Sequence, residues 1–321
     1  MGVFSGLLKR MILVGGPPRS GTRLAAWILN RHPGIATAID DHVYECWALY
    51  YYPARRGLVE RLRKGRLSRR AAARILERHL VRDRHVTGVA ASEKTAGFGE
   101  SRPPQRPGFE VTPQDVRLVR YTVPLDPFFR QRHLCLKSPE ISFVIPRLAS
   151  IFPGARFVLV YRSVEEIAES MYRKGKSVKN TAVYHARWRK ECDANGNLIA
   201  PPGVPEEWTG IWRSVSDFQR CVIYAASYLQ ALDRGLEQTA RERAFVYCHA
   251  DLRSHPESVL AKMARFLDVD PDGFQDVLQG IEPREPPFPG HLKKELQSIS
   301  AELELEGLLK RIKMLDSHVR D

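Results

Sequence analysis

The sequence predicts an α/β protein, with a central parallel β-sheet flanked by helices. Three short and nearly continuous apolar runs are typical of strands buried on both faces, at 11–14, 156–161 and 244–248. Two weaker strand candidates lie at 35–38 and 133–136. Longer stretches with helical spacing of apolar residues lie between or after these runs, at 21–31, 141–151, 164–173, 208–235, 256–267 and 292–315. Strands that alternate with helices in this way favour a parallel sheet covered on both sides.

Composition narrows the class of protein. The chain has 321 residues, of which 43% are hydrophobic and 27% charged, which supports a sizeable core and excludes wholesale disorder. Its net charge of +13 favours anionic ligands. The five cysteines are widely spread with no C-x-x-C pair, so we expect reduced cysteines and a cytoplasmic protein. The sequence has no run of about 18 apolar residues, so no transmembrane segment is expected.

We expect one domain, 1–321, that contains an insertion at 53–130 between the second and third strands. Residues 55–84 hold twelve Lys or Arg and three acidic residues, a net charge of +9. This basic insertion is interpreted either as a solvated helical lid or as an acceptor-binding region, with contact to an anionic surface such as lipid headgroups as a further option. Nucleic acid is disfavoured as a partner because the aromatic residues at 44–52 end before the arginines begin.

The loop after the first strand, 15–23, has the features of a phosphate- or sulfate-binding turn. It joins a buried strand to a helix, so backbone N–H groups and the helix N-terminus are directed at one point. Ser20 and Thr22 add hydroxyl groups, and Arg19 adds a planar cation. The kinase pattern G-x-x-x-x-G-K-[ST] is not matched, because threonine and arginine follow Gly21.

Two separate motifs resemble those of the sulfotransferases that use 3′-phosphoadenosine 5′-phosphosulfate (PAPS). Residues 18–22, Pro-Arg-Ser-Gly-Thr, resemble the family's 5′-phosphosulfate loop. Arg162 follows a predicted strand and Ser170 comes eight residues later, which is similar to the family's 3′-phosphate signature. Tyr172 fits the R-x7-S-x-Y form of the carbohydrate-sulfating relatives. The alternative for the loop is a strand-to-helix turn with incidental glycines. For Arg162 and Ser170 alone, a surface arginine and a helix serine would be the simpler interpretation.

Two further segments support the resemblance. Residues 136–140, Leu-Lys-Ser-Pro-Glu, are similar to the K-S-P segment of bacterial and carbohydrate sulfotransferases. Residues 246–252, Val-Tyr-Cys-His-Ala-Asp-Leu, are similar to the family's Y-E-D-L segment. The chain resembles the bacterial and carbohydrate type, which has a carboxylate base, more closely than the cytosolic type, which has a histidine base.

The resemblance implies a P-loop-like fold and a PAPS-dependent enzyme that sulfates a hydroxyl or amine without a metal. The second product is then 3′-phosphoadenosine 5′-phosphate (PAP), and the acceptor is a small molecule, a carbohydrate or a lipid-like compound. The residues implied at the donor's 5′ end, with Arg19 also catalytic, are Arg19, Ser20, Gly21, Thr22 and Arg23. Arg162 and Ser170 are implied at the 3′-phosphate.

Three lysines and a tyrosine carry weaker assignments. Lys137 is expected to contact the transferring sulfuryl group, and a solvated lysine is the alternative. Tyr247 borders the adenine site or is a core tyrosine at a strand end. Lys293 and Lys294 follow a Pro-Gly pair and could close over the 3′-phosphate, as a C-terminal loop does in the family.

The acceptor must lose a proton, so the site needs a general base. Pro139 stands where the histidine-base enzymes carry their histidine, which excludes that base. Relatives with a carboxylate base place it just after the second strand, where this chain has Asp40, Asp41 and His42, with Glu45 one turn on. We favour Asp41, with the other three as alternatives. One of the two aspartates could instead cap a helix that begins near His42.

Two other functions compete with sulfuryl transfer. A P-loop nucleotide kinase with a degenerate loop would bind ATP and depend on magnesium. A protein without catalytic activity could bind an anionic surface or nucleic acid through residues 55–84.

Overall fold

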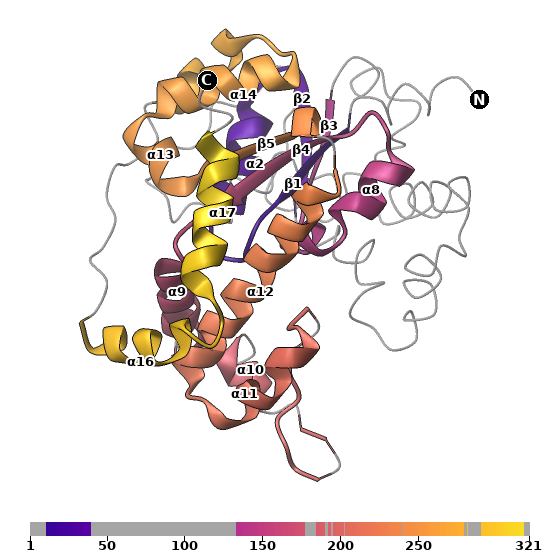
Figure 1. The fold of residues 1–321 in the computed structure, drawn as a ribbon. Helices are drawn as coiled ribbons and strands as arrows, with labels where there is room; N and C mark the ends of the chain where they lie inside the picture. The colour runs from indigo at the N-terminus through magenta and orange to yellow at the C-terminus, as the bar shows by residue number, and fades with distance from the viewer. Residues whose placement is uncertain are drawn as a thin grey trace, which may run out of the picture.

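A single parallel sheet organises the computed structural model, which describes residues 11–39, 133–176, 184–189, 192–193, 195–201, 203–239, 241–278, 281 and 290–317. Within these residues the sheet has five strands in the order β2-β3-β1-β4-β5, and every neighbouring pair is parallel (Figure 1). The strands are β1 Met11–Gly15, β2 Ile35–Ile39, β3 His133–Lys137, β4 Arg156–Tyr161 and β5 Ala244–Cys248. The predicted α/β fold is confirmed, and all five strand candidates are strands.

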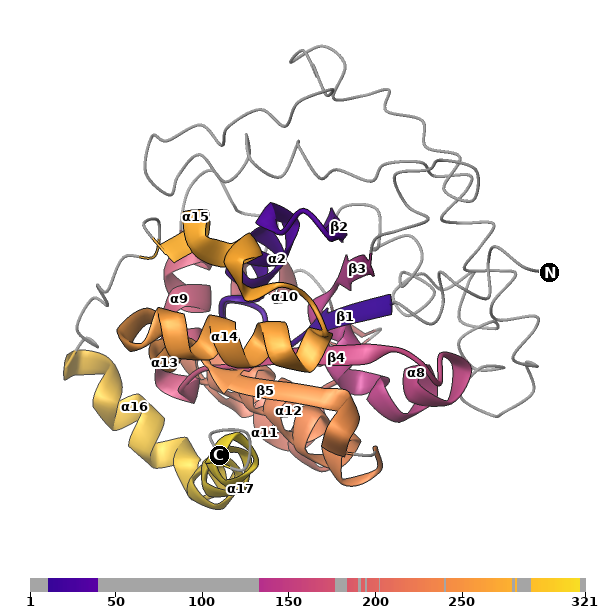
Figure 2. The same cartoon turned by 90° about the horizontal axis from the view of Figure 1, so that it is seen from above.

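Helices cover both faces of the sheet (Figure 2). One hydrophobic cluster joins inward-facing residues of β1, β4 and β5 to α8 (Ile145–Ile151), α9 (Val164–Lys176), α12 (Asp217–Glu237), α16 (Gly290–Ser300) and α17 (Leu305–Ser317). The alternate residues of the same strands pack against α2 (Thr22–Arg31), α13 (His249–Ser254), α14 (Pro256–Leu267) and α15 (Gln275–Leu278). The short helices are η3 Pro139–Phe143, α10 His185–Trp188, η5 Glu206–Trp208, α11 Thr209–Ser214, η6 Arg241–Arg243 and η7 Pro271–Phe274.

Two stretches predicted as continuous helices are broken. Residues 208–235 divide into α11 and α12 because Ser216 caps α12: its hydroxyl accepts from the Gln219 N–H at 3.2 Å, and the Gln219 side chain accepts from the Ser216 N–H at 3.0 Å. Residues 292–315 divide into α16 and α17 at a turn in which Glu304 has φ 50°. Apolar periodicity continues across both breaks, which is why spacing alone missed them.

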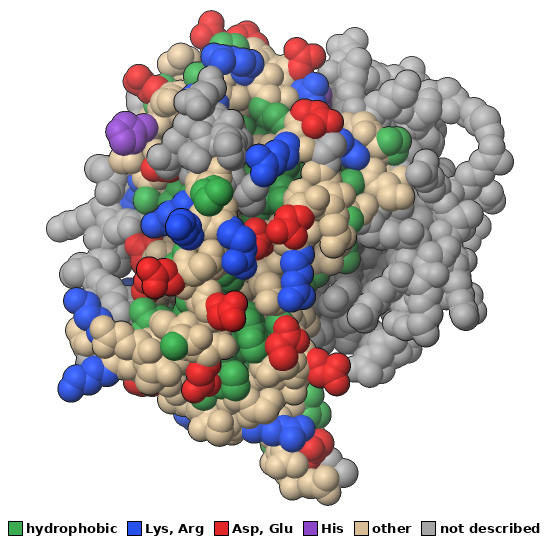
Figure 3. Space-filling model, viewed as in Figure 1, with side chains coloured by type: hydrophobic (Ala, Val, Ile, Leu, Met, Phe, Trp, Pro, Cys, Tyr) green, Lys and Arg blue, Asp and Glu red, His purple; other side chains and the backbone are tan. Residues whose placement is uncertain are grey.

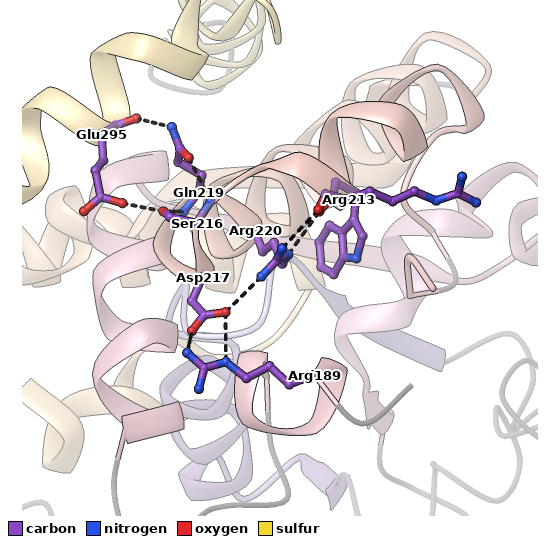
Figure 4. A network of polar contacts seen from close by, with 8 residues as sticks. Arg189, Arg213, Ser216, Asp217, Gln219, Arg220 and Glu295 are labelled. Carbon is purple, nitrogen blue, oxygen red and sulfur yellow. Dashed lines mark hydrogen bonds and ion pairs between the residues drawn. The ribbon is translucent and has the colours of Figure 1, made fainter. Parts of the chain in front are cut away.

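A polar network fixes the helices at the start of α12 (Figure 4). The Arg220 guanidinium donates to the Trp212 carbonyl at 3.0 Å and to the Asp217 carboxylate at 3.0 Å. Asp217 also pairs with Arg189, which follows α10. The Gln219 amide donates to the Glu295 carbonyl at 3.2 Å, which ties α16 to the same point. These contacts hold α10, α11, α12 and α16 together.

Charges of both signs are interspersed over the described residues on the face drawn in Figure 3. Among the helices that the structure describes, none is long and apolar enough to span a bilayer.

Candidate active site

The candidate site lies where the direction of the chain connections reverses in the sheet. From β1 the chain passes to β2 on one side, and from β4 it passes to β5 on the other side. Open α/β sheets bind ligands at such a point, outside the carboxyl ends of the strands. The loop 16–21 after β1 and Arg162 after β4 both lie at this edge, because β1 and β4 are neighbours in parallel register.

The loop after β1 depends on glycine at both of its ends. Gly16 has φ 136°, and a Cβ atom there would lie 2.1 Å from the Val160 carbonyl oxygen. Gly21 has φ 102°, and a Cβ atom there would lie 2.3 Å from the His249 ring. Arg19 also has a positive φ, 72°, a conformation uncommon for a residue with a side chain. This tight turn places the start of α2 beside β4 and leaves Arg19 exposed.

Side chains from neighbouring elements fix the loop. The Gly16 N–H donates to the Ser142 hydroxyl in η3 at 3.0 Å, a contact that the sequence analysis missed. Ser142 lies three residues after the K-S-P segment, so its nearness to that segment in the sequence was the signal that could have identified it. The buried Ser20 hydroxyl donates to the Val160 carbonyl at 3.1 Å, so its proton is directed at β4. Thr22, the first residue of α2, is also buried.

The first two motifs of the sequence analysis meet in the fold. The Arg19 Nε donates to the Ser170 hydroxyl at 3.0 Å, which joins the loop after β1 to α9. Lys174 lies one helical turn after Ser170 and therefore on the same face of α9. Burial lowers the pKa of Lys174, and the positive charges of Arg19 and Arg23 lower it further. Arg19 thus contacts Ser170, and Arg19 and Arg23 both lie near enough to Lys174 to affect it. Sequence reasoning missed Lys174.

Arg162 has a different environment. Its Nε and Nη2 atoms donate to the two carboxylate oxygens of Glu166, at 3.0 and 3.2 Å. The Ser163 hydroxyl donates to the same carboxylate at 2.8 Å. Ser170 therefore contacts Arg19, whereas Arg162 is held by an acidic residue of the first turn of α9. The sequence analysis gave Glu166 no role.

His249 links Arg162 to the loop. Its ring packs against Gly21 at the start of α2. Burial, followed by the charges of Arg162 and Arg253, lowers the pKa of His249 to about 4, although Glu166 opposes this shift. The imidazole is therefore neutral near pH 7. His249 lies in the segment that resembles Y-E-D-L, but nothing in the spacing assigned it a function.

Two other predicted site residues are buried. Lys137 is 2% exposed, ends β3 and lies in register with Val14, and the next residue, Ser138, donates its N–H to the Val14 carbonyl at 3.1 Å. Lys137 therefore adjoins the base of the loop. Tyr247 packs against Phe245 in the core, and its buried hydroxyl has no hydrogen-bond partner among the residues that the structure describes. Burial raises the pKa of Tyr247, and this environment agrees with the core alternative.

The four base candidates, Asp40, Asp41, His42 and Glu45, lie outside the described residues, as does the whole insertion 53–130. Lys293 and Lys294 lie in α16. In the parts of the chain that the structure describes, no cluster of three His, Cys, Asp or Glu side chains could hold a metal ion.

Comparisons with known proteins identify the family of the chain. Residues 11–196 match a protein-family profile described as "Sulfotransferase family". A search of curated proteins found no match. The chain is also similar to solved sulfotransferase structures, at low sequence identity and with TM-scores below 0.5. The sulfotransferase domain from the curacin biosynthetic pathway is 18% identical, with TM-score 0.44 and 92% of this chain and 97% of that one covered. The sulfotransferase from Alicyclobacillus acidocaldarius is 14% identical, with TM-score 0.47 and coverages of 97% and 98%.

Proposed function

The chain belongs to the sulfotransferase family, and we propose that it transfers a sulfuryl group from PAPS to a hydroxyl or amine of an acceptor. The contact between Arg19 and Ser170 carries this proposal. It brings the loop assigned to the donor's 5′ end against the helix assigned to its 3′ end. A nucleotide with phosphates at both its 5′ and 3′ ends needs this loop and this helix at the same edge of the sheet.

The residues around the loop fit the 5′ end of such a donor. The N-terminus of α2 directly follows the loop that carries Arg19, and backbone N–H groups at a helix start favour an anion. The charges of Arg19 and Arg23 both act on Lys174. When bound, PAPS would supply a transferable sulfuryl group and a phosphate leaving group. Arg19 then stabilises the negative charge that develops on the leaving oxygen, a role in which arginine replaces a metal ion. Thr22 and Gly21 contribute their backbone, and Ser20 shapes the loop through Val160.

The 3′ end is assigned to Arg162 and Ser170, each of which has a partner within the protein. Arg162 shares its guanidinium with Glu166, and Ser170 accepts from Arg19. A guanidinium carries five N–H donors, of which the Glu166 carboxylate accepts from two, and a hydroxyl can donate as well as accept. The nucleotide would therefore join contacts that already exist.

The general base is proposed to be Asp41, with Asp40, His42 and Glu45 as the alternatives. These residues follow β2 in the sequence, and the last residue of β2, Ile39, is in register with Lys137 of β3. The base accepts the proton of the acceptor hydroxyl as the sulfur–oxygen bond forms. Lys137 is proposed to orient the sulfuryl group, because it ends β3 beside the loop.

The acceptor is proposed to be a small molecule, a carbohydrate or a lipid-like compound, bound with the help of the insertion 53–130 in a single domain of 1–321. The interpretation of residues 55–84 as a contact for an anionic surface remains part of this proposal. A cytoplasmic location is also proposed. It agrees with Cys192 and Cys221, which are free thiols among the residues described.

A turnover assay tests this function. The protein is incubated with PAPS and with hydroxyl and amine acceptors of the three classes, and PAP formation is followed. We expect acceptor-dependent PAP formation that continues in the presence of a metal chelator. ATP consumption that requires magnesium, with no PAP formed from PAPS by any acceptor, would instead favour the kinase function.

A further inference from the structure

The two ends of the proposed nucleotide site differ in charge. Around the loop, the positive charges of Arg19, Arg23 and Lys174 lie close enough together to lower the pKa of Lys174. At the end of β4, by contrast, the charge of Arg162 is balanced by Glu166 at 3.0 Å. The neighbouring His249 adds no charge near pH 7, because its pKa is about 4. Arg253 also lies close enough to lower the pKa of His249, so at this end of the site Glu166 offsets part of a positive charge that is not offset in the same way at the loop.

Glu166 is held firmly in this arrangement. Its two oxygens accept from the Nε and Nη2 edge of Arg162, the fork-like geometry in which arginine also binds phosphate. Ser163 fixes the carboxylate from the other side at 2.8 Å, and its hydroxyl faces the Glu166 N–H at 3.4 Å. Only 24% of the Glu166 side chain is exposed, so water screens its charge incompletely.

We infer that Glu166 weakens the binding of the nucleotide's 3′-phosphate by occupying one edge of Arg162 and placing a like charge beside the phosphate. This inference rests on the proposed function, in which Arg162 faces that phosphate. A weaker hold at the 3′ end favours release of PAP, while the cations at the loop keep their effect on the reacting end. Glu166 therefore sets how strongly the site binds the 3′-phosphate. It acts through Arg162 and does not touch the reacting atoms.

Replacing Glu166 by glutamine tests the inference, because the amide keeps the size and an acceptor oxygen but removes the charge. Calorimetry on the full chain compares PAP with adenosine 5′-monophosphate, which lacks the 3′-phosphate. For Glu166→Gln we expect PAP to bind about tenfold more tightly, the effect of one unit charge at a partly exposed site. The affinity for adenosine 5′-monophosphate is expected to stay within about twofold, because a neighbouring charge acts mainly on the added phosphate.

Matched variants separate charge from structure. Glu166→Asp keeps the charge, and Glu169→Gln removes a carboxylate of the same helix that pairs with the exposed Arg173. Both are expected to bind PAP as the wild type does. If Glu166→Gln does not fold, Glu166→Ala repeats the test, because alanine also removes the charge and is the residue that favours a helix most.

The outcomes are distinct. Weaker or unchanged PAP binding by Glu166→Gln would overturn the inference and leave sulfuryl transfer standing, as would equal tightening of both nucleotides. Failure of the wild type to bind PAP at all would overturn the proposed function, and the inference with it.

Discussion

Arg19 and Ser170 are 151 positions apart in the sequence, and the Arg19 Nε donates to the Ser170 hydroxyl at 3.0 Å. The contact exists because β1 and β4 are adjacent parallel strands whose following segments leave the same edge of the sheet. It makes the loop after β1 and the helix α9 two walls of one site. Each of the following predictions concerns a residue of this site or the conformation that positions it.

Replacing Arg19 by alanine is expected to lower PAP formation by about 10²–10³, the usual loss when one preorganised donor to developing charge is removed. Arg31→Ala is the matched control, since Arg31 lies in the last turn of α2, the helix that follows the loop, and its guanidinium rests over Trp27. Steady-state rates with PAPS measure the difference. Equal rates for Arg19→Ala and Arg31→Ala would remove Arg19 from the mechanism.

Gly16→Ala is expected to destabilise the fold by about 3 kcal/mol, because the new methyl group would collide with the Val160 carbonyl at a positive φ. Gly210→Ala is the control: a Cβ atom there has nothing within 4 Å, and alanine in a helix is worth up to about 1 kcal/mol over glycine. Urea unfolding gives both values. A Gly16→Ala protein as stable as Gly210→Ala would contradict the loop conformation.

His249 predicts a pH dependence of stability. Its pKa is about 4 in the folded protein, below the ordinary value of 6.5. Between these values the unfolded chain binds a proton that the folded chain does not, so stability falls as the pH is lowered from about 6.5 to 4. The full loss from this group is about 3 kcal/mol. Above pH 6.5 His249 makes its full contribution to the free energy of unfolding.

His249→Gln should therefore show a smaller loss of unfolding free energy between pH 7 and pH 4.5 than the wild type. The exposed His255 supplies the control His255→Gln, in which the wild-type loss is expected to remain. Urea unfolding at the two pH values measures the slopes. If all three proteins lose the same stability, His249 does not resist protonation in the fold.

Asp41→Asn is expected to lower PAP formation by about 10²–10⁴, the range for loss of a general base, while the dissociation constant for PAP stays unchanged. The neighbouring Asp40→Asn serves as the control and should keep most of the activity. Turnover and calorimetry on the same preparations separate chemistry from binding. Full activity of Asp41→Asn would move the base to Asp40, His42 or Glu45.

The sequence predicted the strands, which depend on local patterns of apolar residues. The runs 156–161 and 244–248 are strands over those residues, because continuous apolar residues fit a strand buried on both faces. It did not predict the contacts that depend on packing between distant segments. The contact between Ser142 and Gly16 is of this kind. Glu166 lies only four residues after Arg162, so their pairing was open to sequence reasoning but was not predicted. Lys174 becomes part of the site only because α9 turns that face toward Arg19.

The sequence did not predict the contact that Ser170 makes within the protein. The resemblance implied that Arg162 and Ser170 meet at one phosphate, although about two helical turns of sequence lie between them. The fold in addition brings Arg19 to Ser170. Such a pairing follows from the order of strands in the sheet, which residue spacing does not determine.

Calorimetry of the full chain with PAP, beside ATP with magnesium, tests the central claim most directly, because that claim requires cations for both ends of one nucleotide. We expect PAP to bind with a dissociation constant that rises in both Arg19→Ala and Arg162→Ala, and to bind more tightly than ATP with magnesium. Tighter binding of ATP with magnesium, or PAP binding unaffected by either substitution, would contradict the account.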